Sequence, residues 1–158
     1  MLAETNYIGM SSSFIENLSA CFNSLSVQDI SFLNEKKTQV AYNKGETLIK
    51  QNAFAPHVLF LNSGFAITTL ETAAQKQINV HLAQQGDYIG FSALFSDTYR
   101  YSATTLTPAQ VCMIEKEALS KVLKANPGFA WQITARNWQH EVRYLEMINN
   151  LSYKQMRG

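Results

Sequence analysis

Apolar residues recur at helical spacing near both ends of the chain and in short strand-like runs between them. Phe14, Ile15, Leu18 and Phe22 predict one short helix. Residues 26–33 predict a second helix, because a serine that can cap the first turn precedes an amphipathic pattern. From residue 38 to about 115, β-forming runs are separated by turn residues, which predicts many short antiparallel strands. The clearest runs are 40–42, 57–62, 65–70, 78–83 and 111–114.

Helical periodicity returns after Glu115, with Leu119 and Val122 on one face. The pair Asn126-Pro127 then predicts the start of a new helix, because Asn is a good N-cap and Pro is tolerated at the first helical position. We expect this helix to run to about residue 156. At about 1.5 Å per residue it would be roughly 45 Å long, more than one small barrel can cover.

An apolar stripe follows this predicted helix at three- and four-residue steps, as in a coiled-coil seam. Its members are Trp131, Ala135, Trp138, Val142, Leu145 and Ile148. The stripe predicts a homodimer interface. The alternative is that it packs on its own barrel, and both hold if the N-terminal half packs inward while the C-terminal half pairs.

Composition indicates one globular domain. The chain has 158 residues, of which 46% are hydrophobic and 16% charged. No apolar run is long enough to predict a membrane span, and no signal peptide is visible, so we expect a cytoplasmic protein without a membrane partner. The net charge of +1 and the lack of a long Lys/Arg run indicate that this chain alone does not bind DNA well.

Four segments carry a family resemblance. They are residues 44–51, residues 59–65, the stretch from Gly86 to Ala103, and the long helix opened by Asn126-Pro127. In this order and spacing, the chain resembles the sensor domain of Crp/Fnr-type bacterial transcription regulators, also called the cyclic nucleotide-binding domain. The resemblance covers roughly residues 14–158 and is far more specific than a lone glycine pattern.

The resemblance implies an α+β fold: a double-stranded β-helix (jelly-roll) barrel flanked by short helices and a long C-terminal dimerisation helix. Residues 14–125 would form the β-roll with its flanking helices, and residues 126–158 the dimerisation helix. That helix would lead to a helix-turn-helix DNA-binding domain, whose recognition helix the chain lacks. The implied partners are a second copy of the chain, promoter DNA through that missing domain, and RNA polymerase.

The stretch from Gly86 to Ala103 corresponds to the family's phosphate-binding cassette. In members that bind cyclic nucleotides, a short helix N-terminus and backbone amides hold the phosphate, a Glu holds the ribose hydroxyl and an Arg pairs with the phosphate. Counting along the motif places Phe91 at the Glu position and Tyr101 at the Arg position. Losing a buried charged partner costs on the order of 2–5 kcal/mol, so we do not expect cAMP to be the effector.

The candidate ligand pocket combines the cassette with two residues of the long helix. It comprises Gly90, Phe91, Ser92, Ala93, Arg100, Tyr101, Ser102, Ala103, His140 and Tyr144. Arg100 lies one residue from the Arg position, so it points to solvent, with Asp97 as a candidate partner, unless a bulge turns it inward. His140 and Tyr144 either line a different pocket or flank the helix seam.

Other chemistries find little support in the residues. Cys21 and Cys112 form no Cys-x-x-Cys and are too few for a four-cysteine iron–sulfur cluster, so two reduced thiols are expected. His57, His81 and His140 form no metal-spaced pair, and we predict no metal site and no haem. We find no nucleophile with a base, no paired carboxylates and no phosphate-binding glycine loop of an enzyme, so no catalytic residues are predicted.

The sequence therefore predicts an effector-sensing and dimerisation domain whose signal is a small effector, for which an anion is one candidate and cAMP is not expected, or a signal of another kind; no cofactor is assigned. Effector binding would shift how the roll packs on the long helix and so re-aim the DNA-binding domains. Two alternatives stay open. One is an effector-independent regulator whose pocket is filled by side chains such as Phe91 and Tyr101. The other is a stand-alone cyclic nucleotide-binding module or structural dimerisation domain.

Overall fold

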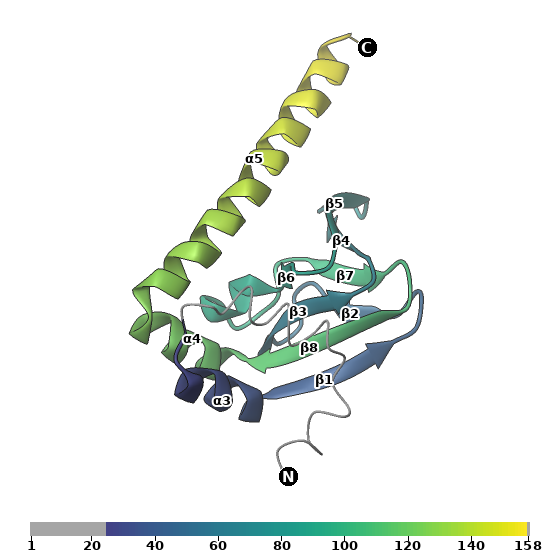
Figure 1. The fold of residues 1–158 in the computed structure, drawn as a ribbon. Helices are drawn as coiled ribbons and strands as arrows, with labels where there is room; N and C mark the ends of the chain where they lie inside the picture. Colours follow the sequence, from purple (N-terminus) through teal and green to yellow (C-terminus); the bar gives the residue numbers. More distant parts are fainter. Residues whose placement is uncertain (1–24, 158) are drawn as a thin grey trace.

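The computed structural model describes residues 25–157, with side chains up to residue 151. The helix predicted around residues 14–22 and Cys21 lie outside the described residues. In Figure 1, a short N-terminal helix and two β-sheets form the body of the domain, and a long C-terminal helix rises from one side of it.

The first described helix is α3 (Val27–Glu35), and it begins where the sequence predicts. The Ser26 hydroxyl caps it by accepting a hydrogen bond from the Asp29 amide at 3.1 Å, which satisfies one of the free N–H groups of the first turn. Leu33 is buried in the core, and Ile30 and Phe32 are partly buried against it, so the cap and this apolar face position the helix.

Eight antiparallel strands form two four-stranded sheets. The order in one sheet is β1 (Lys37–Tyr42), β8 (Ala109–Glu115), β3 (His57–Ser63) and β6 (Tyr88–Ile89). The order in the other is β2 (Thr47–Ile49), β7 (Ser102–Thr105), β4 (Ala66–Glu71) and β5 (Gln77–Ala83). This arrangement confirms the jelly-roll fold class. The two sheets are not closed into a barrel, because no strand ladder joins them within residues 25–157.

The strands differ in how well sequence predicts them. β1, β3, β4, β5 and β8 coincide with the predicted apolar runs. β2, β6 and β7 have only two to four residues, too few to show an alternating pattern. β3 is buried along most of its length because it lies between β8 and β6, and Val58 to Leu61 are fully enclosed.

Two helices complete the fold. α4 (Lys116–Ala125) packs Leu119 and Val122 into the core, and α5 (Pro127–Arg157) starts at the predicted proline. Asn126 joins the two helices: its carbonyl accepts the Ala130 amide, while its side-chain amide donates to the Val122 carbonyl and to Asp29. The sharp turn between α4 and α5 is thereby tied to α3.

Only the first part of α5 is anchored in the core. Phe129 is fully buried and Ile133 nearly so. Beyond them the helix leaves the sheets, and its C-terminal half projects away from the body of the domain (Figure 1). None of the helices described is both long enough and apolar enough to cross a bilayer.

Candidate functional site

The cassette turns around Gly90, which precedes the short 3₁₀ helix η1 (Phe91–Leu94). Gly90 has a φ of 72°, and a Cβ atom at this position would lie 2.8 Å from Cε1 of Tyr99. Both the left-handed backbone and the close approach of Tyr99 require glycine here. The turn ends with the Ala93 amide donating to the Gly90 carbonyl at 3.0 Å.

The Gly90 amide has a side-chain partner. It donates a hydrogen bond of 2.7 Å to the hydroxyl oxygen of Tyr101. Burial raises the pKa of Tyr101 to about 12, although the hydrogen bond from Gly90 opposes the rise. The phenol is therefore neutral near pH 7, and its oxygen lies against the amide at the start of η1.

The rest of the cassette is packed with apolar groups. The half-buried Phe91 ring lies edge-on to Tyr88, with centroids 5.9 Å apart, and Tyr88 lies edge-on to Phe60 in the core at 5.2 Å. Ala93 and Ala103 are buried. An aromatic chain thus connects the expected ribose-binding position to the core.

The two serines of the candidate pocket have different partners. The Ser102 hydroxyl accepts a hydrogen bond from the Gln51 amide at 2.9 Å, which couples β7 to the turn after β2. The Ser92 hydroxyl is buried and has no hydrogen-bond partner among the residues that the structure describes. Neither serine faces a cationic side chain in the described contacts.

Arg100 is exposed to solvent. The partner suggested for it is wrong, because the Asp97 carboxylate lies 3.7 Å from the Lys116 ammonium group instead. Since the Asp97 side chain is 93% exposed, solvent screens this ion pair, which contributes little to stability.

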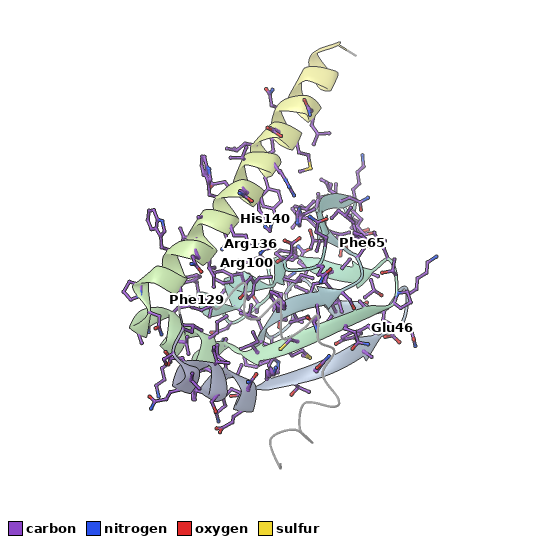
Figure 2. All side chains as sticks on the ribbon, in the orientation of Figure 1. Glu46, Phe65, Arg100, Phe129, Arg136 and His140 are labelled. Atoms are coloured by element: carbon purple, nitrogen blue, oxygen red, sulfur yellow. The ribbon has the colours of Figure 1, made fainter. Side chains whose placement is uncertain are left out.

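A second polar group gathers where the roll meets α5. We call His81, Asp87, Arg136 and His140 the Asp87 cluster. His81 lies on β5, Asp87 in the turn before β6, and Arg136 and His140 on α5. Figure 2 shows Arg136 and His140 on the side of α5 that faces the sheets.

Asp87 is the centre of this cluster, and only 5% of its side chain is exposed. Its Oδ1 lies 3.3 Å from Nη2 of Arg136 and 3.5 Å from Nε2 of His140. Its Oδ2 accepts the Gln84 amide at 2.9 Å and lies 3.6 Å from Nε2 of His81. Burial alone would raise the pKa of Asp87, but the imidazoles of His140 and His81 and the Gln84 amide together hold it well below its usual range.

The two imidazoles of the cluster also contact each other. The rings of His81 and His140 have centroids 4.6 Å apart, and Tyr144 lies edge-on to His81 at 6.0 Å. Sequence spacing indicated no related pair of histidines, whereas the fold brings these two together from positions 59 residues apart. The reason is that β5 and α5 are adjacent only in three dimensions.

Gly86 allows the arginine to reach this cluster. It has a φ of 90°, and a Cβ atom there would lie 2.7 Å from Nη2 of Arg136. A side chain at this position would displace the guanidinium group, so the glycine serves both the turn and the approach of Arg136.

A cavity of about 480 Å³ borders the cluster between the β5–β6 turn and α5. Its lining is mixed: Arg136, Arg143 and His140 on the helix and Asp87 opposite are polar or charged, whereas Ile133 and Ala135 add apolar surface. Gln84, Gln132 and Gln139 add neutral hydrogen-bonding groups. The arrangement can hold a small polar or anionic molecule.

The predicted pocket thus divides into two parts. Gly90, Phe91 and Tyr101 contact one another or the core, whereas the described contacts of His140 and Tyr144 are with Asp87 and His81. Sequence reasoning missed His81, Asp87 and Arg136. A signal existed for the arginine, because residues 136, 140 and 144 recur every four positions and share one helix face.

The predicted seam is uncovered in a single chain. The exposed fractions are 75% for Trp131, 59% for Trp138 and 56% for Leu145. The alternative that this stripe packs on its own sheets is therefore wrong. The inward contact of α5 is made instead by Phe129 and Ile133, which the seam did not include.

Comparisons with known proteins agree with this fold. The family model of the cyclic nucleotide-binding domain matches residues 39–126. No curated protein matches the chain by sequence. Among solved structures, the sensor domain of the transcriptional regulator DNR from Pseudomonas aeruginosa is 19% identical with a TM-score of 0.69, and the match covers 85% of this chain and 90% of that one.

Two longer proteins are also similar. The Catabolite Activator Protein of Thermus thermophilus is 14% identical with a TM-score of 0.68, and the match covers 87% of this chain and 65% of that one. The c-di-GMP responsive global regulator CLP of Xanthomonas campestris is 16% identical with a TM-score of 0.70, with 81% and 65% covered. The chain therefore spans about two thirds of these regulators. Since the family model covers more than half of it, the chain belongs to the cyclic nucleotide-binding domain family, and its fold is that of the sensor domains of Crp/Fnr-type regulators.

Proposed function

We propose that the chain is the effector-sensing and dimerisation domain of a Crp/Fnr-type transcription regulator, and that its cassette does not respond to cAMP. The observation that carries the proposal is the 2.7 Å hydrogen bond from the Gly90 amide to the Tyr101 hydroxyl. In relatives that bind cyclic nucleotides, amides of this turn hold the phosphate. Here a buried phenol already accepts from one of them.

Cyclic AMP would have to displace Tyr101 and would gain little in return. Moving the phenol costs its hydrogen bond and its apolar packing, and the neutral ring offers no charge to a phosphate. Phe91 adds a second obstacle, because its ring cannot accept a hydrogen bond from a ribose hydroxyl. Both positions therefore oppose the same ligand.

The cavity beside α5 is the better candidate for an effector. Arg143 supplies hydrogen-bond donors and a positive charge, His140 adds a polar ring nitrogen, and the cavity volume of about 480 Å³ suits a small metabolite. A small anion bound there would contact the turn before β6 and α5 at once. Its binding would favour one position of the helix over others, which is how a sensor domain can redirect the domains beyond it.

A thermal-shift series with cAMP, cGMP and a panel of anionic metabolites tests the effector. A ligand at one hundred times its Kd adds about 2.7 kcal/mol of stability and several degrees to Tm. We expect no shift with cyclic nucleotides and a shift with at least one anion. The shift should be lost in Arg143→Gln and kept in Lys76→Gln, which removes an exposed charge from the β4–β5 turn.

A specific observation also supports an effector-independent regulator: Tyr101 and Phe91 fill the cassette with the protein's own side chains. Under this second function, no member of the panel shifts Tm, and the Arg143→Gln variant behaves like the wild-type chain in every condition.

Dimerisation is proposed through the exposed seam of α5. Replacing Trp138 and Leu145 with Lys would place charges where a paired seam cannot satisfy them. We expect the wild-type chain to sediment as a dimer and the double variant as a monomer in analytical ultracentrifugation. A double variant Gln139→Lys/Asn150→Lys adds the same two charges at exposed positions of α5 outside the seam and should stay dimeric. Dimers that persist in the first variant would contradict the seam.

A further inference from the structure

The Asp87 cluster contains three groups that can each give one atom to a metal ion. These are Nε2 of His81, a carboxylate oxygen of Asp87 and a ring nitrogen of His140, and all lie within 4.8 Å of one another. We propose that His81, Asp87 and His140 form a binding site for a divalent first-row transition-metal ion that links α5 to the β-roll. The inference goes beyond the sensor function and stands independently of the identity of the effector.

The distances suit such an ion. Nε2 of His81 is 3.6 Å and Nε2 of His140 3.5 Å from oxygens of Asp87. Ligands bound to one ion at about 2.1 Å in tetrahedral geometry are about 3.4 Å apart. The two contacts are to different oxygens of Asp87, but the three ligand atoms lie within 4.8 Å of one another, so side-chain movements alone would let the three groups share an ion.

His81 provides the second, independent observation. Its side chain is only 9% exposed, and its buried Nε2 makes no hydrogen bond among the described residues, because the Asp87 oxygen beside it, Oδ2, is 3.6 Å away. A buried polar nitrogen without a partner costs free energy, on the order of 1–3 kcal/mol. A metal ion bound by the unprotonated nitrogen would remove this cost.

The ligand types select the class of ion. Two imidazoles with one carboxylate favour Zn²⁺, Fe²⁺, Co²⁺ or Ni²⁺ over Mg²⁺ and Ca²⁺, which prefer oxygen ligands. Three protein ligands leave at least one coordination position for water or an exogenous group. Asp87 and His140 also line the 480 Å³ cavity, so a molecule in that cavity is close enough to be such a group.

The positive charge of Arg136 repels a metal cation, so removing this charge should strengthen metal binding, whereas removing a ligand should weaken it. Its Nη2 lies 3.3 Å from Oδ1 of Asp87, and its side chain is 37% exposed. With an ion bound, the guanidinium group can turn toward solvent, but its positive charge still lowers the affinity. Removing that charge should strengthen metal binding, although it removes a hydrogen bond from the metal-free protein.

The site would connect parts of the chain that move relative to one another in a sensor. His81 and Asp87 belong to the roll, whereas His140 lies seven residues beyond Ile133, the last buried contact of α5. An ion would extend the anchored part of α5 toward its uncovered seam. Metal occupancy would thereby restrict the direction in which α5 leaves the domain.

The test is isothermal titration of the untagged, chelator-treated chain with ZnCl₂, in a Cys21→Ser background that removes the thiol outside the described residues. We expect one ion per chain. The His81→Gln and His140→Gln variants should each lose at least about tenfold in affinity, whereas His57→Gln, a histidine outside the cluster, should bind like the parent. Arg136→Gln should bind Zn²⁺ more tightly than the parent.

Visible absorption of the Co²⁺-loaded chain gives a second readout that needs no histidine variant. Absorption bands of Co²⁺ with nitrogen and oxygen ligands are expected at one equivalent, and Zn²⁺ should displace them. Far-UV circular dichroism checks that the variants fold. The absence of saturable Zn²⁺ binding, equal losses in His57→Gln, or weaker binding in a folded Arg136→Gln variant would each overturn the proposal.

Discussion

The Gly90 turn of the cassette and the Asp87 cluster meet at β6, but their polar groups are used differently. In the cassette, the Gly90 amide and the Ser102 hydroxyl are satisfied by other parts of the same chain. In the cluster, Nε2 of His81 has no hydrogen-bond partner among the described residues, and a cavity with several charged and amide side chains lies alongside. The Gly90 amide of the expected binding turn is thus satisfied from within, although the buried Ser92 hydroxyl is not, and the cavity lies between the β5–β6 turn and α5 instead.

Two neighbouring parts of one fold can therefore differ in whether their polar groups are satisfied by the chain itself. Tyr101 satisfies the backbone at Gly90 from within, so the turn no longer needs a phosphate to be stable. Arg136 and His140, by contrast, come from a helix whose contacts with the roll are few beyond Ile133. Groups on such a helix can change partners at low cost.

The largest effect, on the affinity for cAMP, is expected from replacing the two side chains that fill the cassette. The double variant Phe91→Glu/Tyr101→Arg supplies an acceptor for the ribose and a cation for the phosphate. Each charged partner is worth on the order of 2–5 kcal/mol, so affinity for cAMP should rise by at least tens of fold, measured by isothermal titration. Tyr101→Phe is the matched control, because it frees the Gly90 amide without adding charge. A double variant that folds and still ignores cAMP would show that more than these two positions closes the cassette.

A smaller effect, on the free energy of unfolding, is expected from a substitution at Gly86, which lies beside Arg136 of the Asp87 cluster. Gly86→Ala should destabilise the fold by about 1–3 kcal/mol, because it strains the backbone and displaces Arg136. Gly45 is the matched control: its φ is also positive, at 82°, but nothing lies within 4 Å of an added Cβ. Urea unfolding should therefore show a larger loss for Gly86→Ala than for Gly45→Ala. Equal losses would mean that Arg136 contributes nothing at this turn.

Removing the Tyr101 hydroxyl should lower the free energy of unfolding by about 1 kcal/mol. Tyr101→Phe leaves the Gly90 amide without its partner. An unsatisfied amide costs about 1–3 kcal/mol, and a water molecule that reaches the amide reduces this cost. The comparison variant is Tyr42→Phe, whose hydroxyl makes only a 4.0 Å contact with the Met113 sulfur. Chemical denaturation should separate the two. If Tyr101→Phe were as stable as Tyr42→Phe, the hydrogen bond would not close the cassette.

The stability that the neutral Tyr101 phenol contributes should depend on pH only above about pH 10. Its pKa is raised to about 12 in the folded protein by burial. The stability from the neutral phenol is therefore complete below the ordinary tyrosine pKa of about 10 and is lost as the pH rises from there toward 12. Phenolate absorbance of wild type and Tyr101→Phe should coincide up to about pH 10.5. An excess in wild type with a midpoint near pH 10 would indicate an exposed, mobile Tyr101.

Much of the fold follows from local patterns. The Ser26 cap, the start of α5 at Pro127 and five of the strands are predicted by residues within each element. The three short strands and the open edge of the two sheets depend on pairing between distant segments. No local window contains that information.

The site divides in the same way. The position of Tyr101 in the cassette follows from counting along one motif, but its hydrogen bond to Gly90 depends on how β7 returns beside η1. His81 and His140 are ordinary residues in sequence, on a strand and a helix that only the tertiary fold brings together. The inward face of α5 was missed because its small stripe, which includes Phe129 and Ile133, runs beside the more prominent tryptophan seam.

The most direct test of the closed cassette is an NMR titration of the ¹⁵N-labelled chain with cAMP, read at the amides of Gly90, Phe91 and Ala93. The account predicts that these signals do not move at cAMP concentrations up to about 1 mM, a range that covers binding free energies stronger than about −4 kcal/mol. Saturable shifts at the Gly90 amide, absent from residues far from η1, would contradict it and would place cAMP where Tyr101 lies.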